Sequence, residues 1–329
     1  MNSAIRWVGL VVTMLAALSL GTARAAGGYT FVDLGTFGGA VDSHAYGIND
    51  AGQIVGDMRT TTGEIHGFVW QKGSVQDIGS LGGGYSRARA INNRGQVVGD
   101  ASLASGVRHA FLWEKGRMRD LGTIGEGASA ARAINDRGQI VGEFTASDDN
   151  GHAFLWEKGH MIDLGAPAGG SSSALAINAA GQIVGIAYYP EQDQVLAVRW
   201  EHSGLVPLGT LAGDSQSTAF GINNRGQVVG TSSGALSHGV LWNNGRMTGL
   251  ADGQSQAIAI NNRGDVAGTW QPSAESPTYM SVWRKGVRTT LPIPDNSAGD
   301  VLGINNRGAV VGWAVITGQG VHAVLWQPT

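Results

Sequence analysis

The sequence predicts an all-β fold, a seven-bladed β-propeller with four-stranded blades. Three observations support this prediction. A repeat of about 43 residues recurs seven times, each repeat holds four short strand-like segments, and the chain opens with a strand that the last repeat lacks.

The repeat is marked by an Ile-Asn pair, and successive pairs are 43, 43, 43, 45, 38 and 44 residues apart. The isoleucines are Ile48, Ile91, Ile134, Ile177, Ile222, Ile260 and Ile304. A tryptophan keeps the same rhythm, at Trp70, Trp113, Trp156, Trp200, Trp242, Trp283 and Trp326. Seven such repeats account for residues 26–329, so we expect a single domain there.

The second repeat shows the four strands most clearly, at residues 87–92, 96–100, 109–113 and 117–121. All four are short, rich in β-branched or aromatic residues, and bounded by Gly or Asn. The Asn-Asn-Arg-Gly sequence at 92–95 is typical of a tight hairpin turn. Four strands in a period of 40 to 50 residues indicate propeller blades, whereas helical solenoids would show 3.6-residue periodicity.

The two chain ends favour a closed ring. Residues 29–35 resemble the fourth strand of later repeats but precede the first Ile-Asn pair, and the last repeat ends at its third strand, 322–326. In a ring, the N-terminal strand completes the last blade and leaves only short sheet edges. The alternative is a β-solenoid or another stacked-sheet array, which normally carries distinct capping units.

Residues 1–25 have the layout of a secretory signal peptide, with Arg6, an apolar run from Trp7 to Leu20, and an Ala-x-Ala site that predicts cleavage after Ala25. An uncleaved anchor is the alternative, but the run is shorter than the ~20 residues that span a bilayer. We expect a secreted or periplasmic product of residues 26–329 without a membrane span.

The composition excludes several function classes. Removing Arg6 and Arg24 leaves 20 basic and 25 acidic residues, a net charge near −5, which argues against a nucleic-acid partner. The sequence contains no cysteine, so disulfides and thiol chemistry are excluded. We expect a monomer without a cofactor.

A combined motif covers residues 29–326: Ala-x-Ala-Ile-Asn, then Gly-Gln-Val-Val-Gly, then His-Ala-Phe-Leu-Trp and Asp-Leu-Gly. This motif resembles the bacterial extracellular repeats of the HAF family. Two repeats depart from it, with Leu196-Ala-Val and Tyr279-Met-Ser in place of His-Ala-Phe. The resemblance implies an exported bacterial protein but carries over no activity and no catalytic residues.

Histidines recur at one repeat position and raise the possibility of a metal site. They alternate with Phe and Trp on one strand face, and the other two repeats have Leu196 and Tyr279 there, which favours a structural role and no metal. The histidines are His66, His109, His152, His238 and His322.

Acidic residues follow the Val-Gly of the second strand in the first three repeats, at Asp57, Asp100 and Glu143. We interpret them as partners of the histidines that open the third strands of the same hairpins. A general-base arrangement is the alternative.

The connections that vary in length should share one face of the propeller, where a ligand site is expected. That face would present four aromatic and three acidic residues: Tyr188, Tyr189, Trp270, Trp313, Asp57, Asp100 and Glu143. The ligand would be an extracellular or periplasmic carbohydrate or protein. Because these residues are spread over several repeats, a non-enzymatic binding or scaffolding module is favoured. A polysaccharide lyase or glycoside hydrolase working in the funnel of that face is the alternative.

Overall fold

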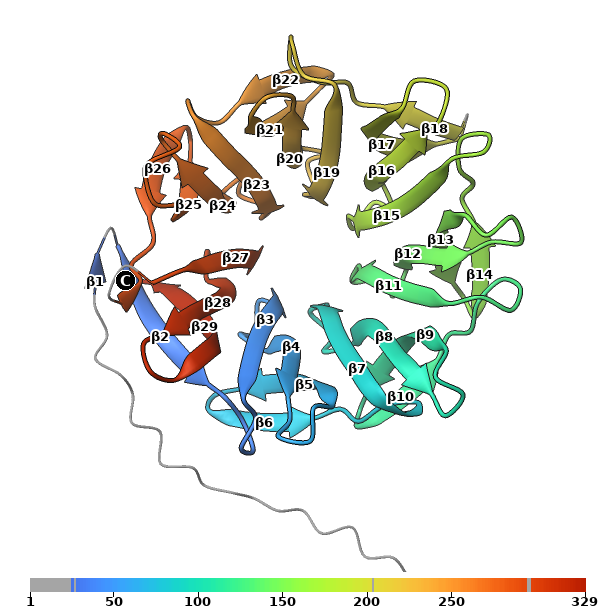
Figure 1. Ribbon diagram of the computed structural model, residues 1–329, viewed down its shortest axis with the longest axis horizontal. Coiled ribbons are helices and arrows are strands. Elements are labelled where there is room, and N and C mark those ends of the chain that lie inside the picture. Colours follow the sequence, from blue (N-terminus) through green and yellow to red (C-terminus); the bar gives the residue numbers. More distant parts are fainter. Residues whose placement is uncertain (1–24, 27, 203, 295–296) are drawn as a thin grey trace, which may run out of the picture.

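The structure is a computed structural model that describes residues 25–26, 28–202, 204–294 and 297–329. Its strands form four-stranded antiparallel units that stand around a central axis, with one strand of each unit nearest to that axis (Figure 1). This is the architecture of a β-propeller, so the all-β propeller part of the predicted fold class is confirmed. The predicted signal peptide falls on residues 1–24, which lie outside the described residues, and on Ala25.

The strand nearest to the axis is called the first strand of its unit here, and it ends at the Ile of the Ile-Asn pair. First strands are β3 (Asp42–Ile48), β7 (Gly82–Ile91), β11 (Ser129–Ile134), β15 (Ser171–Ile177), β19 (Gln216–Ile222), β23 (Gln254–Ile260) and β27 (Gly299–Ile304). Second strands are β4 (Ile54–Arg59), β8 (Val97–Leu103), β12 (Ile140–Thr145), β16 (Ile183–Tyr189), β20 (Val228–Ser233), β24 (Val266–Gln271) and β28 (Val310–Ile316).

The outer half of each unit carries the tryptophan-bearing third strand and a shorter fourth strand. Third strands are β5 (Ile65–Gln71), β9 (Arg108–Glu114), β13 (Gly151–Glu157), β17 (Gln194–Glu201), β21 (Ser237–Asn243), β25 (Tyr279–Arg284) and β29 (Gly320–Pro328). Fourth strands are β6 (Ser74–Asp77), β10 (Arg117–Asp120), β14 (His160–Asp163), β18 (Gly204–Pro207), β22 (Arg246–Gly249), β26 (Val287–Thr290) and β2 (Tyr29–Gly35).

Because the strands of a unit are antiparallel and in chain order, the connections alternate between two faces. The turn face holds the Asn turns and the two-residue hairpins between third and fourth strands. In one such hairpin Lys115 has φ 52° and Gly116 has φ 79°, as a type I′ turn requires. The loop face holds the connections of variable length, as the sequence predicts.

The apolar core lies between neighbouring units. One cluster combines Val55 and Val69 of the first unit with Val97 and Phe111 of the second. A buried serine in most first strands also joins adjacent units. The Ser129 hydroxyl, for example, accepts the backbone N–H of Ala110 at 2.9 Å. Packing between units therefore fixes where each first strand stands relative to its neighbours.

Each first strand contains a β-bulge two residues before its Ile-Asn pair. In β7 the ladder passes from Ala88, opposite Gly99, to Ala90, opposite Val98, so Arg89 is the extra residue. The strands approach so closely here that a Cβ on Gly99 would lie 1.8 Å from the carbonyl oxygen of Arg87, which explains the Val-Gly motif of the second strands. The bulged residues are Tyr46, Arg89, Arg132, Leu175, Phe220, Ile258 and Leu302.

On the turn face, the asparagines of the Ile-Asn pairs form a closed ring of hydrogen bonds around a cavity of about 190 Å³. The Asn92 Oδ1 accepts the backbone N–H groups of Arg94 and Gln96, and its Nδ2 donates to the carbonyl of Asn135 in the next unit, all at 3.0 Å. The Asn305 Nδ2 of the last unit donates to the carbonyl of Asn49 in the first unit at 3.0 Å, and this bond closes the ring. The members of this asparagine ring are Asn49, Asn92, Asn135, Asn178, Asn223, Asn261 and Asn305.

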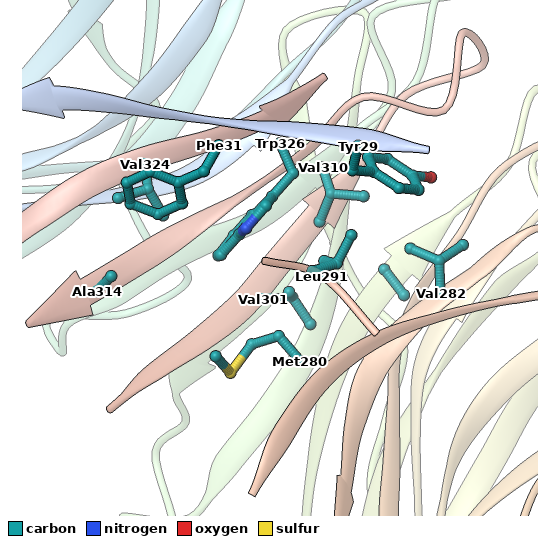
Figure 2. Close-up of a cluster of buried hydrophobic side chains, with 11 residues drawn as sticks. Tyr29, Phe31, Met280, Val282, Leu291, Val301, Val310, Ala314, Val324 and Trp326 are labelled. Carbon is teal, nitrogen blue, oxygen red and sulfur yellow. The ribbon is translucent and has the colours of Figure 1, made fainter. Parts of the chain in front are cut away.

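The chain ends meet at the last unit, as predicted. Strand β2 pairs with β29, with Phe31 opposite Trp326, and β1 (Ala25–Ala26) adds a short strand outside β2. The rings of Phe31 and Trp326 meet edge to face at 6.0 Å, and the Trp326 indole N–H donates to the carbonyl of Pro292 at 2.6 Å. Figure 2 shows both side chains, with Tyr29, over the core that β25 and β28 complete.

Candidate functional site

Asp57 lies near the loop-face end of β4 and is almost fully enclosed by polar partners. The Arg87 Nε donates to its carboxylate at 2.6 Å and the Tyr46 hydroxyl donates at 3.1 Å. The His44 Nδ1 lies 3.0 Å from its other oxygen. Arg87 belongs to the next unit, so the carboxylate joins two first strands, β3 and β7.

The equivalent acidic residues in the next two units repeat this arrangement. The Arg89 Nε donates to Asp100 at 2.7 Å, and the Arg132 guanidinium donates to Glu143 at 2.5 to 2.9 Å. The Ser173 hydroxyl, in the unit that follows, also donates to Glu143 at 2.5 Å. Each carboxylate thus binds the bulged side chain of its own unit.

We call this group the axial site: Tyr46, Asp57, Arg87, Arg89, Asp100, Arg132 and Glu143. Burial raises the pKa of Asp57, but the hydrogen bond with His44 and the charge of Arg87 outweigh burial and hold that pKa below its usual value. Burial lowers the pKa of Arg132, but its hydrogen bond with Glu143 and the charge of Glu143 raise it above its usual value. Both groups are therefore ionised at neutral pH.

The arginines of the axial site are more accessible than the carboxylates beneath them. The side chains of Asp57 and Asp100 are 4% and 3% exposed, whereas those of their partners Arg87 and Arg89 are 29% and 20% exposed. Arg87 and Arg89 bind their carboxylates through Nε, and no acceptor among the described residues bonds their terminal nitrogens. Buried anions thus hold guanidinium groups whose terminal N–H groups have no acceptor within the described residues.

Aromatic rings restrain these guanidinium groups further. The Arg87 ζ carbon lies 5.6 Å from the centre of the Tyr46 ring and 5.9 Å from that of Tyr85. The Arg108 ζ carbon, on β9, lies 5.3 Å from the centre of the Tyr85 ring. Cation–π attraction at these distances limits the rotamers that Arg87 can adopt, so its terminal nitrogens are oriented in advance.

The axial site occupies one side of the ring of first strands. In the later units the bulged position is apolar, with Leu175, Phe220, Ile258 and Leu302. The repeat is therefore symmetric in backbone and asymmetric in the chemistry that it presents around the axis.

Trp313 joins the axial site to a second polar region. Its ring meets that of His44 edge to face at 6.2 Å, and in the ladder it stands opposite Asp300 of β27. Burial raises the pKa of Asp300 above its usual value, and the backbone N–H of Val301, at 2.8 Å, is its hydrogen-bond donor among the described residues. Asp300 is thus a half-buried carboxyl group without a cationic partner in the described part of the chain.

Asp300 lies in a loop-face pocket of about 540 Å³ that we call the amide pocket. Its wall is rich in amide and hydroxyl groups from β23, β24 and the start of β21. These groups both donate and accept hydrogen bonds, and they include Ser237, Gln254, Gln256, Thr269 and Gln271. Volumes of this size are usual for small-molecule sites.

The remaining predicted aromatic residues take part in contacts of their own. The Tyr188 hydroxyl donates to Asp193 in its own loop at 3.1 Å, and Tyr189 is half-buried at the end of β16. The Trp270 ring lies under Arg288, 3.7 Å from its ζ carbon, and beside Tyr279. Of the four predicted aromatic residues, the structure brings Trp313 to the axial site.

The predicted pairing of the repeat histidines with Asp57, Asp100 and Glu143 is wrong. In the ladder His66 stands opposite Met58, so Asp57 projects from the other face of β4. The partner of His66 is Asp77 of the fourth strand, at 2.7 Å. His109, His152 and His322 likewise bind Asp120, Asp163 and Asp33, and His238 binds Asp214, at distances of 2.9 to 3.2 Å.

Two further findings concern metal and membrane. Over the described ranges, no cluster of three or more His, Asp or Glu side chains could hold a metal ion. That part of the chain contains no helix that is long and apolar enough to cross a bilayer.

The sequence interpretation missed the arginines of the axial site and Asp300. Arg87 and Arg89 stand four and two residues before Ile91, and in the first repeat the same positions hold His44 and Tyr46. Aligning the repeats on their Ile-Asn pairs would have revealed these positions, because they lie on the innermost strand and their residues differ in charge from one repeat to the next.

No protein-family model matches the sequence, and no curated protein matches it. Among solved structures, the chain is similar to the β-propeller domain of the Trilobed protease from Pyrococcus furiosus, which has an open velcro topology. That likeness has a TM-score of 0.59 and 9% identity, and it covers 88% of this chain and 95% of that one.

Two puromycin-hydrolysing proteins are also similar in fold. A puromycin hydrolase complexed with PGG has a TM-score of 0.58, 12% identity and coverage of 86% of this chain and 51% of that one. A puromycin-hydrolysing peptidase of Mycobacterium tuberculosis has a TM-score of 0.54, 12% identity and coverage of 94% and 51%. The chain spans about half the length of these two proteins. At such low identity the likeness concerns the fold alone, and that fold is the β-propeller.

Proposed function

We propose that the protein is an exported, non-enzymatic binding module of the HAF-repeat type. In this proposal residues 26–329 form one domain, a monomeric propeller of seven blades. Six blades use strands β3 to β26 in chain order, and β27, β28, β29 and β2 make the seventh. The ligand binds on the loop face at the axial site.

The observation that carries the proposal is the state of the charged groups in the axial site. Its three carboxylates already bind arginines, and the pKa of Asp57 is lowered, so they are poor candidates for proton transfer near neutral pH. The terminal nitrogens of Arg87 and Arg89 have no acceptor in the described part of the chain and can bind an external one. Oriented donors over buried anions suit recognition better than acid–base catalysis.

One observation favours the second candidate, a polysaccharide lyase or glycoside hydrolase. Asp300 is a carboxyl group with a raised pKa in a pocket, which is the usual environment of a general acid. Glycoside hydrolysis normally needs two carboxylates about 5 to 10 Å apart. Asp300 is the one ionisable residue in the lining of the amide pocket among the described residues, so binding remains the better interpretation.

A glycan and metabolite binding screen of the purified mature protein tests this proposal. We expect a ligand whose affinity falls at least tenfold when Arg87→Gln is combined with Asp57→Asn, a pair that removes both charges together. The control Arg246→Gln, on the exposed start of β22, should bind normally. Turnover of a bound saccharide, abolished by Asp300→Asn, would establish the enzyme instead.

Export has its own test. Expression with residues 1–25 in a Gram-negative host should release a product whose intact mass corresponds to a chain that starts at Ala26. A product that keeps residues 1–25 and remains with the membrane fraction would contradict the signal-peptide proposal.

A further inference from the structure

We propose that the loop face binds an acidic oligosaccharide, with a carboxylate on the arginines of the axial site and sugar hydroxyls in the amide pocket. This inference rests on the proposed binding function and adds the chemistry of the ligand. Three features carry it: an anion-binding end, an aromatic middle and a hydroxyl-binding end.

The anion-binding end consists of Arg87 and Arg89. Their Nε atoms are taken by Asp57 and Asp100, so the groups left for a ligand are the terminal amino groups. Because the carboxylates beneath are 4% and 3% exposed, the groups that these two ion pairs offer to solvent are mainly the guanidinium donors. A planar carboxylate matches such guanidinium groups in both charge and geometry.

The aromatic middle consists of Tyr46, His44 and Trp313. The rings of His44 and Tyr46 stack with centres 6.2 Å apart, and the rings of His44 and Trp313 meet edge to face, also at 6.2 Å. All three side chains are partly exposed. Their exposed ring surfaces offer apolar contact to sugar rings.

The hydroxyl-binding end is the amide pocket. Gln254 and Gln256 offer amides that donate and accept, and Asp300 is an acceptor without a cation among the described residues. The Gln271 amide nitrogen donates to the carbonyls of Ala274 and Ser276, which leaves its oxygen as an acceptor. A hydroxyl group that donates to Asp300 would replace the hydrogen bonds that its burial removes. A neutral, hydroxyl-rich group therefore fits this end better than a second anion.

The two ends of the proposed site are linked by a series of contacts. Asp300 stands opposite Trp313 in the ladder, the rings of Trp313 and His44 lie 6.2 Å apart, and His44 and Arg87 both contact Asp57, at 3.0 and 2.6 Å. Because the aromatic middle lies between the two ends along this series, we infer that a ligand contacting both ends is an oligomer.

Calorimetric titration with three trisaccharides tests the inference: glucuronosyl-xylobiose, which has a single carboxylate, its methyl ester, and the neutral xylotriose. We expect the acid to bind at least tenfold more tightly than its ester or xylotriose, and more weakly as salt concentration rises. The double variant Asp57→Asn with Arg87→Gln should lower the affinity for the acid to that for the ester. Equal affinity for the acid and the ester would overturn the inference.

Further variants separate this inference from the proposed function. Trp313→Ala should weaken the acid and the ester alike, and Arg246→Gln should weaken neither. If another class of ligand binds and is lost in the axial double variant, the acidic saccharide is wrong and the binding function stands. If no axial variant changes the binding of any ligand, both proposals fail. A thermal transition recorded for each variant excludes loss of folding as the cause.

Discussion

Asp57, on the second strand β4, and Asp300, on the first strand β27, show how the same residue type acquires opposite properties in one fold. Both are withdrawn from solvent, which raises a carboxyl pKa. Asp57 meets His44, Tyr46 and Arg87, and these contacts bring its pKa below the usual value. Asp300 has the N–H of Val301 as its donor, so burial prevails and its pKa is raised.

This difference predicts the effect of Asp300→Asn on stability. Because the folded-state pKa is raised, ionisation of Asp300 costs stability as pH rises above the pKa of a free carboxyl, near 4. The variant should therefore melt roughly 1–2 °C higher than the parent at pH 7. At pH 3, where the carboxyl is neutral, the variant and the parent should have the same melting temperature. Circular dichroism melts at both pH values measure this. The control Asp252→Asn, in an exposed loop, should show no difference, and stabilisation by Asp300→Asn at pH 3 as well would contradict the assignment.

At this scale the sequence predicted the acidic residues of the site but not their partners. Asp57, Asp100 and Glu143 follow a repeated Val-Gly motif and are visible in the sequence. Their partners depend on which side of the pleat each side chain leaves, and one residue separates Asp57 from the face that His66 shares. The contact between Arg87 and Asp57 also crosses from one unit to the next, which spacing within a repeat does not reveal.

At the scale of the element, the β-bulge determines where the axial side chains lie. A bulge adds one residue to a strand and redirects its side chain. In β3, β7 and β11 that residue is Tyr46, Arg89 or Arg132, and each binds the carboxylate of its own second strand. A glycine on the partner strand is required at each bulge. At Gly99, for example, the absence of a side chain leaves room for the carbonyl oxygen of Arg87.

Gly99→Ala should therefore destabilise the protein. A Cβ at this position would lie 1.8 Å from the carbonyl oxygen of Arg87, so the bulge in β7 must be rebuilt. We expect a loss of roughly 3 kcal/mol in the free energy of unfolding, the size of a severe core change. Urea denaturation measures it. Gly249→Ala, where no atom lies within 4 Å of the added Cβ, should change stability little. A mild effect at Gly99 would mean that the strands are further apart than described.

Strand positions were predictable and the bulges were not. In the second repeat the predicted strand at 109–113 corresponds to β9 (Arg108–Glu114), because Gly and Asn turns mark its limits. The first strand starts earlier than predicted, at Gly82 rather than Arg87. A bulge leaves the pattern of apolar residues nearly unchanged, so that pattern does not reveal it. The feature of the sequence that indicates the bulge is a single glycine inside the partner strand.

At the scale of the whole molecule, closure combines a strand pairing with the asparagine ring. The pairing of β2 with β29 brings Tyr29 and Phe31 onto the core of the last unit. The sequence predicted this because its first strand matches the fourth strands of later repeats. The ring of Asn side chains was not predicted, since bonds between equivalent turns depend on the distance between units.

Deleting residues 29–35 should abolish cooperative unfolding. The deletion uncovers Trp326, which is fully buried, and removes the Asp33 partner of His322. A circular permutant is the matched control. Because the N–H of Thr329 donates to the carbonyl of Gly28 at 3.0 Å, a short linker can join these ends, with a new opening in the exposed loop at Glu126. Calorimetry should show one sharp transition for the permutant and a broad one or none for the deletion. An unchanged transition after the deletion would contradict closure through β2.

The asparagine ring has a single direction, since every side chain donates to the carbonyl of the unit that follows it. Each repeat in this ring contributes one donor, its Asn side-chain amide, and one acceptor, the backbone carbonyl of the same Asn. On the turn face, therefore, every unit makes the same bond with the unit before it and the unit after it, and the differences between units are concentrated toward the loop face.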